Sequence, residues 1–258
     1  INPMCVRELA DVPKRPNGLC MLPGGVLAIA SCEYHSQAAV KFVAARSDSD
    51  PQALAAYRAS SLAARRFEWL MGLALTNDGL LACNLRAASV ALYKFATDGS
   101  MDELATVPVL ADYSHGFKRC AVHRQTQRTY AIGDGEDGRS AVVLDANLQV
   151  VASIEAVAAG DGPISDIAVH GDQVIILTGN NHPRGSGLRL LDLDGQFLRT
   201  IVAAQFRNPW ALTASHGRAF VVDDDDKIGP GIDDDDSDDD WEPGKVLHVI
   251  DIQSGDIL

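Results

Sequence analysis

Three histidines in polar segments between apolar runs could together hold a metal ion: His35, His115 and His182. Imidazole nitrogens are common zinc ligands, and three that converge would supply most of a tetrahedral site. These three lie in separate parts of the chain, however, and separate loop histidines are ordinarily solvated, so we predict no metal centre. Three other histidines follow apolar runs directly, and we expect them to be solvated turn residues: His123, His170 and His216.

A second candidate is the acidic segment, residues 223–244, which holds eleven aspartates and Glu242 against a single cation, Lys227. Ca²⁺ prefers oxygen ligands, but the spacing here is not that of an EF-hand. Like-charge runs usually repel one another and serve as solvated interaction segments. We therefore expect a solvated loop, with a weak site for Ca²⁺ or another divalent cation, or for a basic partner, as the alternative. Its defining residues are Asp223, Asp224, Asp225, Asp226, Asp233, Asp234, Asp235 and Asp236.

The acidic segment also accounts for the charge of the chain. The 258 residues carry a formal net charge of −13, but outside residues 223–242 there are 23 acids against 21 bases. No basic patch is present that could neutralise a phosphate backbone, which argues against a nucleic-acid partner. No apolar run approaches the roughly 20 residues of a transmembrane helix, so we expect no membrane insertion. The five cysteines form no CxxC pair, which favours a reducing, intracellular compartment without fixing the location.

Five similar segments must position these residues. Each is an apolar strand, a polar or Gly-containing turn and a second apolar strand: Gly18–Ile29, Gly72–Cys83, Cys120–Ile132, Ile167–Ile176 and Ala211–Val222. If residues 20, 74, 121, 168 and 213 are equivalent, their spacings are 54, 47, 47 and 45. Short strands that repeat about every 45 residues are typical of β-propeller blades. The sequence therefore predicts one all-β domain, residues 1–258, of five four-stranded blades, with the acidic segment as a loop insertion in the last.

The outer strands of the blades follow in register. Predicted third strands are Ala38–Val43, Val90–Phe95, Ser140–Leu144, Leu188–Leu193 and Lys245–Ile252, and predicted fourth strands are Glu103–Val109, Gln149–Ile154 and Phe197–Val202. The first blade differs, because Asp50–Arg66 is Ala-rich with near-helical apolar spacing and favours a helical turn as much as a strand. The last blade lacks a fourth strand, and Met4–Leu9 is a spare one that could close the ring. The alternative is an open fragment of a six-bladed propeller.

Two segments resemble the NHL-repeat family of propellers. One is Gly179-Asn180-Asn181-His182 followed by Leu188–Leu198, which is similar to that family's Asn-His and Arg-apolar-apolar-apolar-Asp-x-x-Gly-x-Phe run. The weaker match is Leu92–Gly99. The resemblance implies a propeller fold, although that family usually has six blades, and it implies little about function because propellers host both binders and enzymes.

A looser resemblance concerns the metal site of gluconolactonase-like propellers. Pro16-Asn17-Gly18 is similar to their Pro-Asn-Gly, which implies Asn17 as a metal ligand. The positions taken as equivalent in the other blades are Met71, Lys118, Ser165-Asp166 and Asn208, and only Asp166 is of the right type. Pro-Asn-Gly is also an ordinary turn sequence, which is the interpretation we prefer.

Two functions follow from these patterns. The leading hypothesis is a non-catalytic binding or scaffold propeller that meets a protein or peptide, basic in character, on its loop face. The rival is a metal-dependent hydrolase or lyase with a divalent cation at Asn17 and Asp166. The polar residues that the loops and blade links present are the candidate binding residues: His35, Arg86, His115, Lys118, Asp166, His182, Arg184, Asn208 and Trp210.

Overall fold

The computed structural model describes residues 16–31, 39–60, 63, 70–84, 89–95, 101–108, 117–133, 140–155, 162–179, 186–203, 206–225 and 244–258. The chain divides into two compact units, residues 1–136 and 137–258. Within the described residues, no helix is long and apolar enough to cross a membrane.

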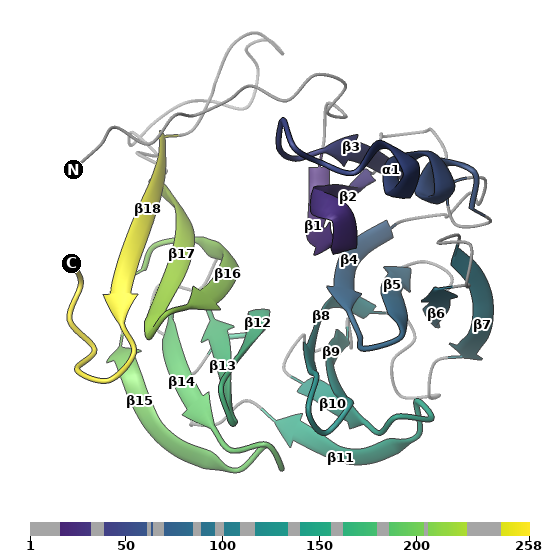
Figure 1. The fold of residues 1–258 in the computed structure, drawn as a ribbon. Coiled ribbons are helices and arrows are strands. Elements are labelled where there is room, and N and C mark those ends of the chain that lie inside the picture. Colours follow the sequence, from purple (N-terminus) through teal and green to yellow (C-terminus); the bar gives the residue numbers. More distant parts are fainter. Residues whose placement is uncertain are drawn as a thin grey trace, which may run out of the picture. The chain divides into compact units, whose positions relative to one another are not determined.

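Among its described residues, the first unit contains nine strands and the α-helix α1 (Figure 1). In chain order they are β1 (Pro16–Leu22), β2 (Val26–Ser31), β3 (Ala39–Ala44), α1 (Pro51–Arg58), β4 (Leu70–Leu75), β5 (Gly79–Asn84), β6 (Ser89–Phe95), β7 (Met101–Pro108), β8 (Phe117–His123) and β9 (Arg128–Gly133), with a short 3₁₀ turn at Pro23–Gly25.

The second unit contains nine described strands. They are β10 (Ser140–Leu144), β11 (Val150–Glu155), β12 (Ile164–His170), β13 (Gln173–Thr178), β14 (Gly187–Leu191), β15 (Phe197–Ala203), β16 (Pro209–Ser215), β17 (Arg218–Asp225) and β18 (Gly244–Asp251). The last residues of the chain turn back along β18, where Ile257 bridges to Ile250 and the backbone N–H of Leu258 donates to the carbonyl of Val249 at 2.8 Å.

The strands form five antiparallel sheets in which neighbours along the chain are neighbours in the sheet. The sheets are β1–β3, β4–β7, β8–β11, β12–β15 and β16–β18. This up-and-down order confirms the prediction of an all-β fold built from propeller blades. Three of the sheets have four strands, and the first and last have three among the described residues. The predicted closing strand, Met4–Leu9, lies outside the described residues.

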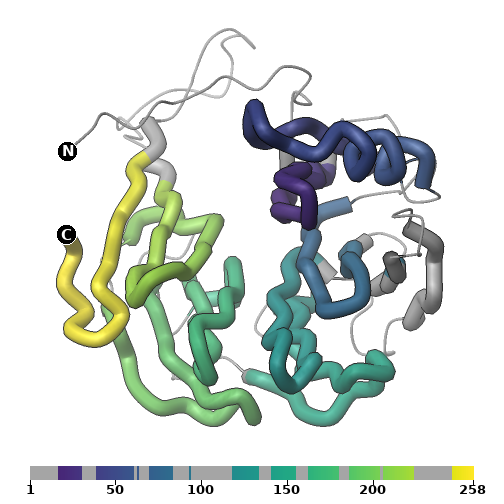
Figure 2. Tube along the Cα trace, in the orientation of Figure 1, coloured from purple at the N-terminus to yellow at the C-terminus, as the bar shows by residue number. Residues whose placement is uncertain are grey.

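A helix follows the third strand of the first sheet, which decides the alternative that the sequence left open at Asp50–Arg66. Asp50 begins α1 by accepting a hydrogen bond from the backbone N–H of Gln52 at 2.8 Å, and Pro51 fits the first helical turn. Figure 2 follows the chain from β3 through a tight turn into α1. The ring of Tyr57 packs on that of Phe42 in β3, with centroids 5.7 Å apart, so α1 covers one face of the sheet.

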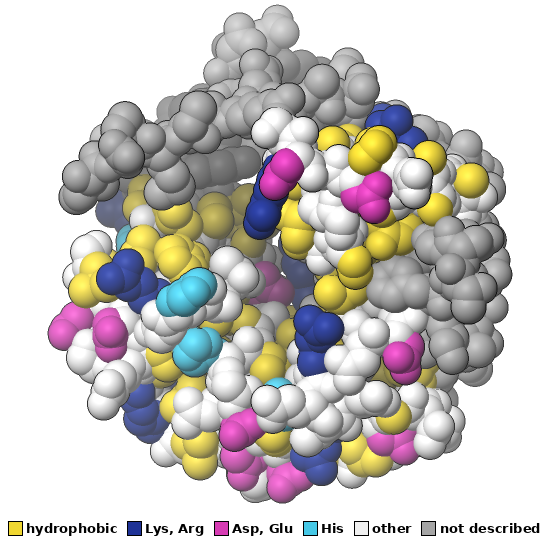
Figure 3. Space-filling view, viewed as in Figure 1, with side chains coloured by type: hydrophobic (Ala, Val, Ile, Leu, Met, Phe, Trp, Pro, Cys, Tyr) yellow, Lys and Arg dark blue, Asp and Glu magenta, His cyan; other side chains and the backbone are white. Residues whose placement is uncertain are grey.

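Each unit has its own apolar core. In the first, buried residues of β1 to β6 pack with Tyr57, and in the second, buried residues of β12 to β18 pack with Phe206. Their alternation along the strands reflects the two-residue period of a sheet. On the face that Figure 3 shows, hydrophobic side chains lie interspersed among acidic and basic ones.

Candidate functional site

A bulge interrupts the first strand of every sheet at the same place in the repeat. The extra residue in each is Asn17, Met71, Lys118, Ser165 or Trp210. Each bulge lies three residues before the residue that the sequence repeat set as equivalent, so the spacings of 54, 47, 47 and 45 are confirmed. A bulge redirects a side chain and is often found beside a functional site. In the last sheet, the sequence comparison took Asn208 as the equivalent position. The bulge residue is Trp210 instead, and Asn208 lies just before the start of β16 at Pro209.

In the first unit, the residue after each bulge fixes the spacing of adjacent first strands. Gly18 lies so close to β4 that a Cβ atom there would approach the carbonyl oxygen of Met71 to 2.8 Å. Arg119 of β8 reaches across with its guanidinium: Nη1 donates to the carbonyl of Met71 at 2.8 Å and to the carbonyl of Asn17. The backbone of Asn17, the predicted metal-binding residue of the looser resemblance, is therefore held by an arginine.

In the second unit, Asp166 is the residue directly after the bulge in β12, as Gly18 and Arg119 are after theirs in the first unit. Its side chain is buried, with Oδ1 accepting from the N–H of Ile167 at 2.8 Å and Oδ2 accepting from the N–H of Leu212 in β16 at 2.7 Å. Both oxygens of this predicted ligand thus bind backbone amides and join two first strands. The neighbouring hydroxyl of Ser165 is buried and has no hydrogen-bond partner among the described residues.

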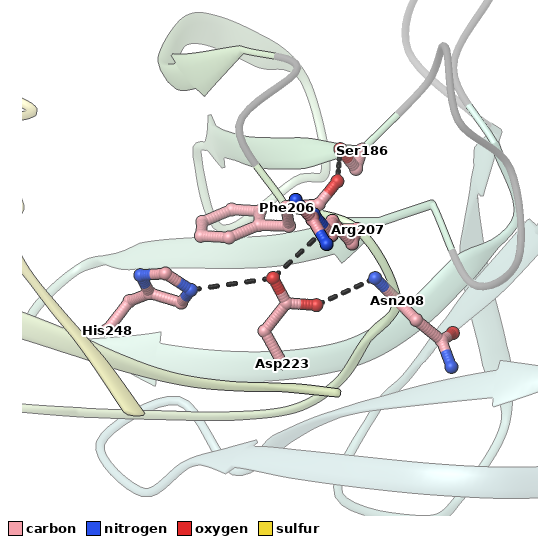
Figure 4. Close-up of polar contacts among 6 residues, drawn as sticks. All are labelled: Ser186, Phe206, Arg207, Asn208, Asp223 and His248. Atoms are coloured by element: carbon pink, nitrogen blue, oxygen red, sulfur yellow. Dashed lines mark hydrogen bonds and ion pairs between the residues drawn. The ribbon is translucent and has the colours of Figure 1, made fainter. Parts of the chain in front are cut away.

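A second carboxylate of this unit, Asp223, is the centre of a polar cluster (Figure 4). Its Oδ2 accepts from the N–H of Arg207 at 3.0 Å, and its Oδ1 accepts from the N–H of Asn208 at 2.7 Å. Nε2 of His248 lies 3.4 Å from the same Oδ2, and the imidazole packs edge-on against Phe206 with centroids 5.3 Å apart. Asp223 is 5% exposed. The first residue of the acidic segment is therefore a structural anchor, and β17 continues to Asp225 instead of ending at Val222 as predicted.

Ser186 completes the cluster from the loop before β14. Its hydroxyl donates to the carbonyl of Phe206 at 2.6 Å (Figure 4). The three residues before β16 are thus held from two directions. The hydroxyl of Ser186 binds the carbonyl of Phe206, and the carboxylate of Asp223 binds the N–H groups of Arg207 and Asn208. The contacts bind the backbone, and within the described residues no three His, Cys, Asp or Glu side chains come together as metal ligands.

Several predicted site residues lie outside the described residues: His35, Arg86, His115, His182, Arg184, Asp226, Asp233, Asp234, Asp235 and Asp236. Of the others, the structure brings Asn208 to Asp223 in the second unit, and places Lys118 and Trp210 on bulges. Asp224 and Asp225 belong to β17 and pair with Lys245 and Gly244 of β18.

One histidine prediction is wrong. His123 is buried, and its Nδ1 lies 2.7 Å from the hydroxyl of Thr126, because the turn after β8 folds back over the ring. No sequence pattern predicted the roles of Arg119, Ser186, Phe206 and His248. The one local signal for His248 is a histidine within the apolar strand Val246–Ile250.

The thiol of Cys20 has an unusual environment in the first unit. Burial, and to a lesser degree the nearby thiol of Cys120, raise the pKa of Cys20 to about 12 from an ordinary value of 9.0. We expect iodoacetamide at pH 8 to alkylate Cys20 more than tenfold more slowly in the native protein than in the guanidine-unfolded chain, because the thiolate is the nucleophile. Mass spectrometry of digested samples measures this. Equal rates would contradict the burial of the thiol.

The raised pKa of Cys20 also makes the stability of the fold depend on pH. Because the pKa of Cys20 is higher in the folded chain than in the unfolded one, its contribution to stability is fully present below pH 9 and declines as the pH rises toward 12.

The sequence matches no known family profile and no curated protein. Among solved structures, a nidogen/laminin complex is similar with a TM-score of 0.59 and 9% identity, over 94% of this chain and 78% of that one. The computationally designed Ika8 protein gives 0.55 and 10%, over 94% of this chain and 60% of that one. The glutaminyl cyclase of Myxococcus xanthus gives 0.48 and 12%, over 80% and 84%. At these identities, the first two show a likeness of fold alone, and the nidogen/laminin structure supports the β-propeller fold.

Proposed function

We propose that this chain is a non-catalytic β-propeller binding domain that meets a basic protein or peptide through its loops, above all through the acidic segment between β17 and β18. The observation that carries the proposal is the anchoring of this segment. The two strands remain paired as far as Asp225 and Gly244, and Asp223 is fixed by two backbone amides and His248. The acidic residues that follow are therefore attached to a strand pair whose base is held by the contacts of Asp223.

Charge and fold support the same proposal. Twelve acids between residues 223 and 242 create a strong local negative potential, which accelerates encounter with a basic partner and disfavours acidic ones. The buried carboxylates of Asp166 and Asp223 serve the backbone instead of presenting a reactive group. The similar nidogen/laminin structure is by its description a complex of proteins, so this fold is compatible with a protein partner.

Replacing residues 227–242 with a short Gly-Ser linker tests the proposal. The change removes seven aspartates, Glu242 and Lys227, and so raises the formal net charge from −13 to −6. We expect the variant to melt close to the intact protein, since β17 and β18 are adjacent where the segment leaves them and loop-closure entropy changes slowly with length. Calorimetric binding of an arginine-rich peptide should weaken at least tenfold.

The controls separate charge from structure. The affinity of the intact protein for the arginine-rich peptide should weaken as the salt concentration is raised from 50 to 300 mM. Exposed charges are screened over about 8 Å at physiological ionic strength, and over less at higher salt. Unchanged peptide affinity in the linker variant would refute the proposal. A stoichiometric, tightly bound divalent ion in the purified protein would favour the metal-dependent hydrolase or lyase instead.

A further inference from the structure

The last sheet has the beginning of a fourth strand. β18 is the outermost of its three strands, and after β18 the chain turns back beside it, at the yellow end of the ribbon in Figure 1. The N–H of Leu258 donates to the carbonyl of Val249 at 2.8 Å. The N–H of Asp251 donates to the carbonyl of Asp256 at 2.9 Å. These antiparallel bonds cover the edge of β18 from Val249 to Asp251.

A turn that recurs in the second unit identifies this return as the start of a fourth strand. In each copy, one carboxylate oxygen of an aspartate accepts from two backbone N–H groups further along the turn, at 2.8 or 2.9 Å. The three aspartates are Asp145, Asp192 and Asp251. The first two turns lead into β11 and β15, the fourth strands of their sheets. The turn at Asp251 therefore leads into the same place in the last sheet.

The rest of this edge, residues 244–248, is open at Leu247, and we call it the open edge. Along an antiparallel strand, the N–H and C=O of every second residue face the same side. Val249 and Asp251 turn theirs toward the returning chain, so Leu247 turns its own that way. Leu247 is 59% exposed and Val246 is 38% exposed. Within the described part of the chain, no strand pairs with β18 at this edge.

The direction of the fourth strand brings its far end to the acidic segment. A strand that follows the course of Leu258 runs antiparallel to β18, so its C-terminal end reaches Gly244. Gly244 pairs with Asp225 at the end of β17. Residues 223–245 hold twelve acids against two cations, Lys227 and Lys245. Basic residues at the C-terminal end of an added strand are therefore favoured there.

The side chains of the open edge call for apolar partners. Val246 and Leu247 are adjacent, so they face opposite sides of the sheet. Each is an exposed apolar side chain. Apolar or β-branched residues directly opposite them on an added strand would form stabilising cross-strand pairs.

We propose that the partner of this chain is an extended peptide that adds to the open edge as the missing part of the fourth strand. Its apolar residues lie opposite Val246 and Leu247, and its basic residues lie at its C-terminal end. Backbone pairing supplies affinity, and charge supplies the direction. The inference rests on the proposed function, because the acidic segment sets the charge of the partner.

Four capped peptides test strand addition to the full chain by calorimetry. The forward peptide is Thr-Val-Val-Thr-Arg-Arg-Arg. The others are its reversed sequence, the forward peptide with methylated Thr and Val nitrogens, and Gly-Ser-Gly-Ser-Arg-Arg-Arg. We expect the forward peptide to bind at least tenfold more tightly than each of the others. Equal binding of the forward and Gly-Ser peptides would overturn strand addition and leave the proposed function standing, whereas no binding by any peptide would overturn both.

Substitution of Leu247 locates the site. L247P removes the outward N–H, and proline is tolerated where a strand N–H faces away from its neighbour. L247P should weaken the forward peptide at least tenfold, whereas L247T, which keeps the N–H, should weaken it less than threefold. Melting curves establish that both variants are folded. In the intact protein, hydrogen exchange at the amide of Leu247 should slow when the forward peptide binds. Unchanged exchange, or equal binding by L247P, would refute the proposal.

The N-terminal residues of this chain are the alternative occupant of the open edge. Removal of residues 1–10 should leave the affinity for the forward peptide within about threefold of its original value. Binding that appears only after this removal would show that the chain fills the edge itself, and the proposal would then be wrong.

Discussion

Replacing Asp223 with alanine is expected to lower the free energy of unfolding by about 3 kcal/mol. The carboxylate accepts hydrogen bonds from the N–H groups of Arg207 and Asn208 and faces Nε2 of His248. Alanine leaves the two amides without their acceptor and opens space beside the imidazole. Bonds to an ionised group are roughly twice as strong as neutral ones, so this single side chain has a large effect.

Asparagine at the same position tests the role of the charge. D223N keeps the shape and one accepting oxygen but turns an NH₂ group toward a backbone N–H, so we expect a loss of about 2 kcal/mol. The control is D78A, which removes an exposed carboxylate from the turn between β4 and β5 and should change stability by less than about 0.5 kcal/mol. Urea unfolding followed by circular dichroism measures all three. If D223A unfolds at the same urea concentration as the intact protein, Asp223 is not an anchor.

The anchor also links stability to the proposed binding. Asp223 is followed directly by the residues that lead into the acidic segment. If the loss of Asp223 loosens the base of that segment, D223A should weaken the binding of arginine-rich peptides. The decrease in affinity should be larger than the removal of one of the twelve negative charges explains. The linker variant, which keeps Asp223, should lose peptide binding without losing stability. The two variants therefore separate the base of the segment from its charges.

The repeat was predictable from the sequence because its signals are local. Alternating apolar residues and turn residues mark each pair of strands, and the predicted bounds Ser140–Leu144 coincide with β10. The five bulges keep the spacings of the sequence repeat, since each blade needs the same irregularity at the same point of its first strand. The Ala-rich segment that follows Asp50 indicated the helix α1, which stands where other sheets have a fourth strand.

The polar cluster could not be predicted in this way, since its contacts join distant parts of the chain. Asp223 looks like the first residue of a solvated run, and only the amides of Arg207 and Asn208, about fifteen residues earlier, show that it is buried. Arg119 binds the carbonyl of Asn17, 102 residues away. A strand pattern states which residues face the core, but it does not state which polar group meets which backbone group.

Two adjacent residues of β12 give the last prediction, because their substitution by alanine should have opposite effects. D166A should lower the free energy of unfolding by about 3 kcal/mol, since the buried N–H groups of Leu212 and Ile167 lose the carboxylate that they bind. S165A should leave stability unchanged or raise it by up to about 1 kcal/mol, since it removes a buried hydroxyl that has no hydrogen-bond partner among the described residues.

The comparison also tests the rival function at the same position. A structural Asp166 predicts that D166A is destabilised equally with and without divalent cations. If Asp166 instead holds a metal, added Ca²⁺ or Zn²⁺ should raise the melting temperature of the intact protein and not that of D166A, because an ion that binds only the folded state stabilises it, by an amount that grows with the logarithm of the ion concentration above Kd. Thermal unfolding in EDTA and with each cation distinguishes these outcomes. A cation-dependent difference between the two proteins would favour the metal-dependent alternative. A destabilised S165A would show instead that the buried hydroxyl of Ser165 makes a stabilising contact.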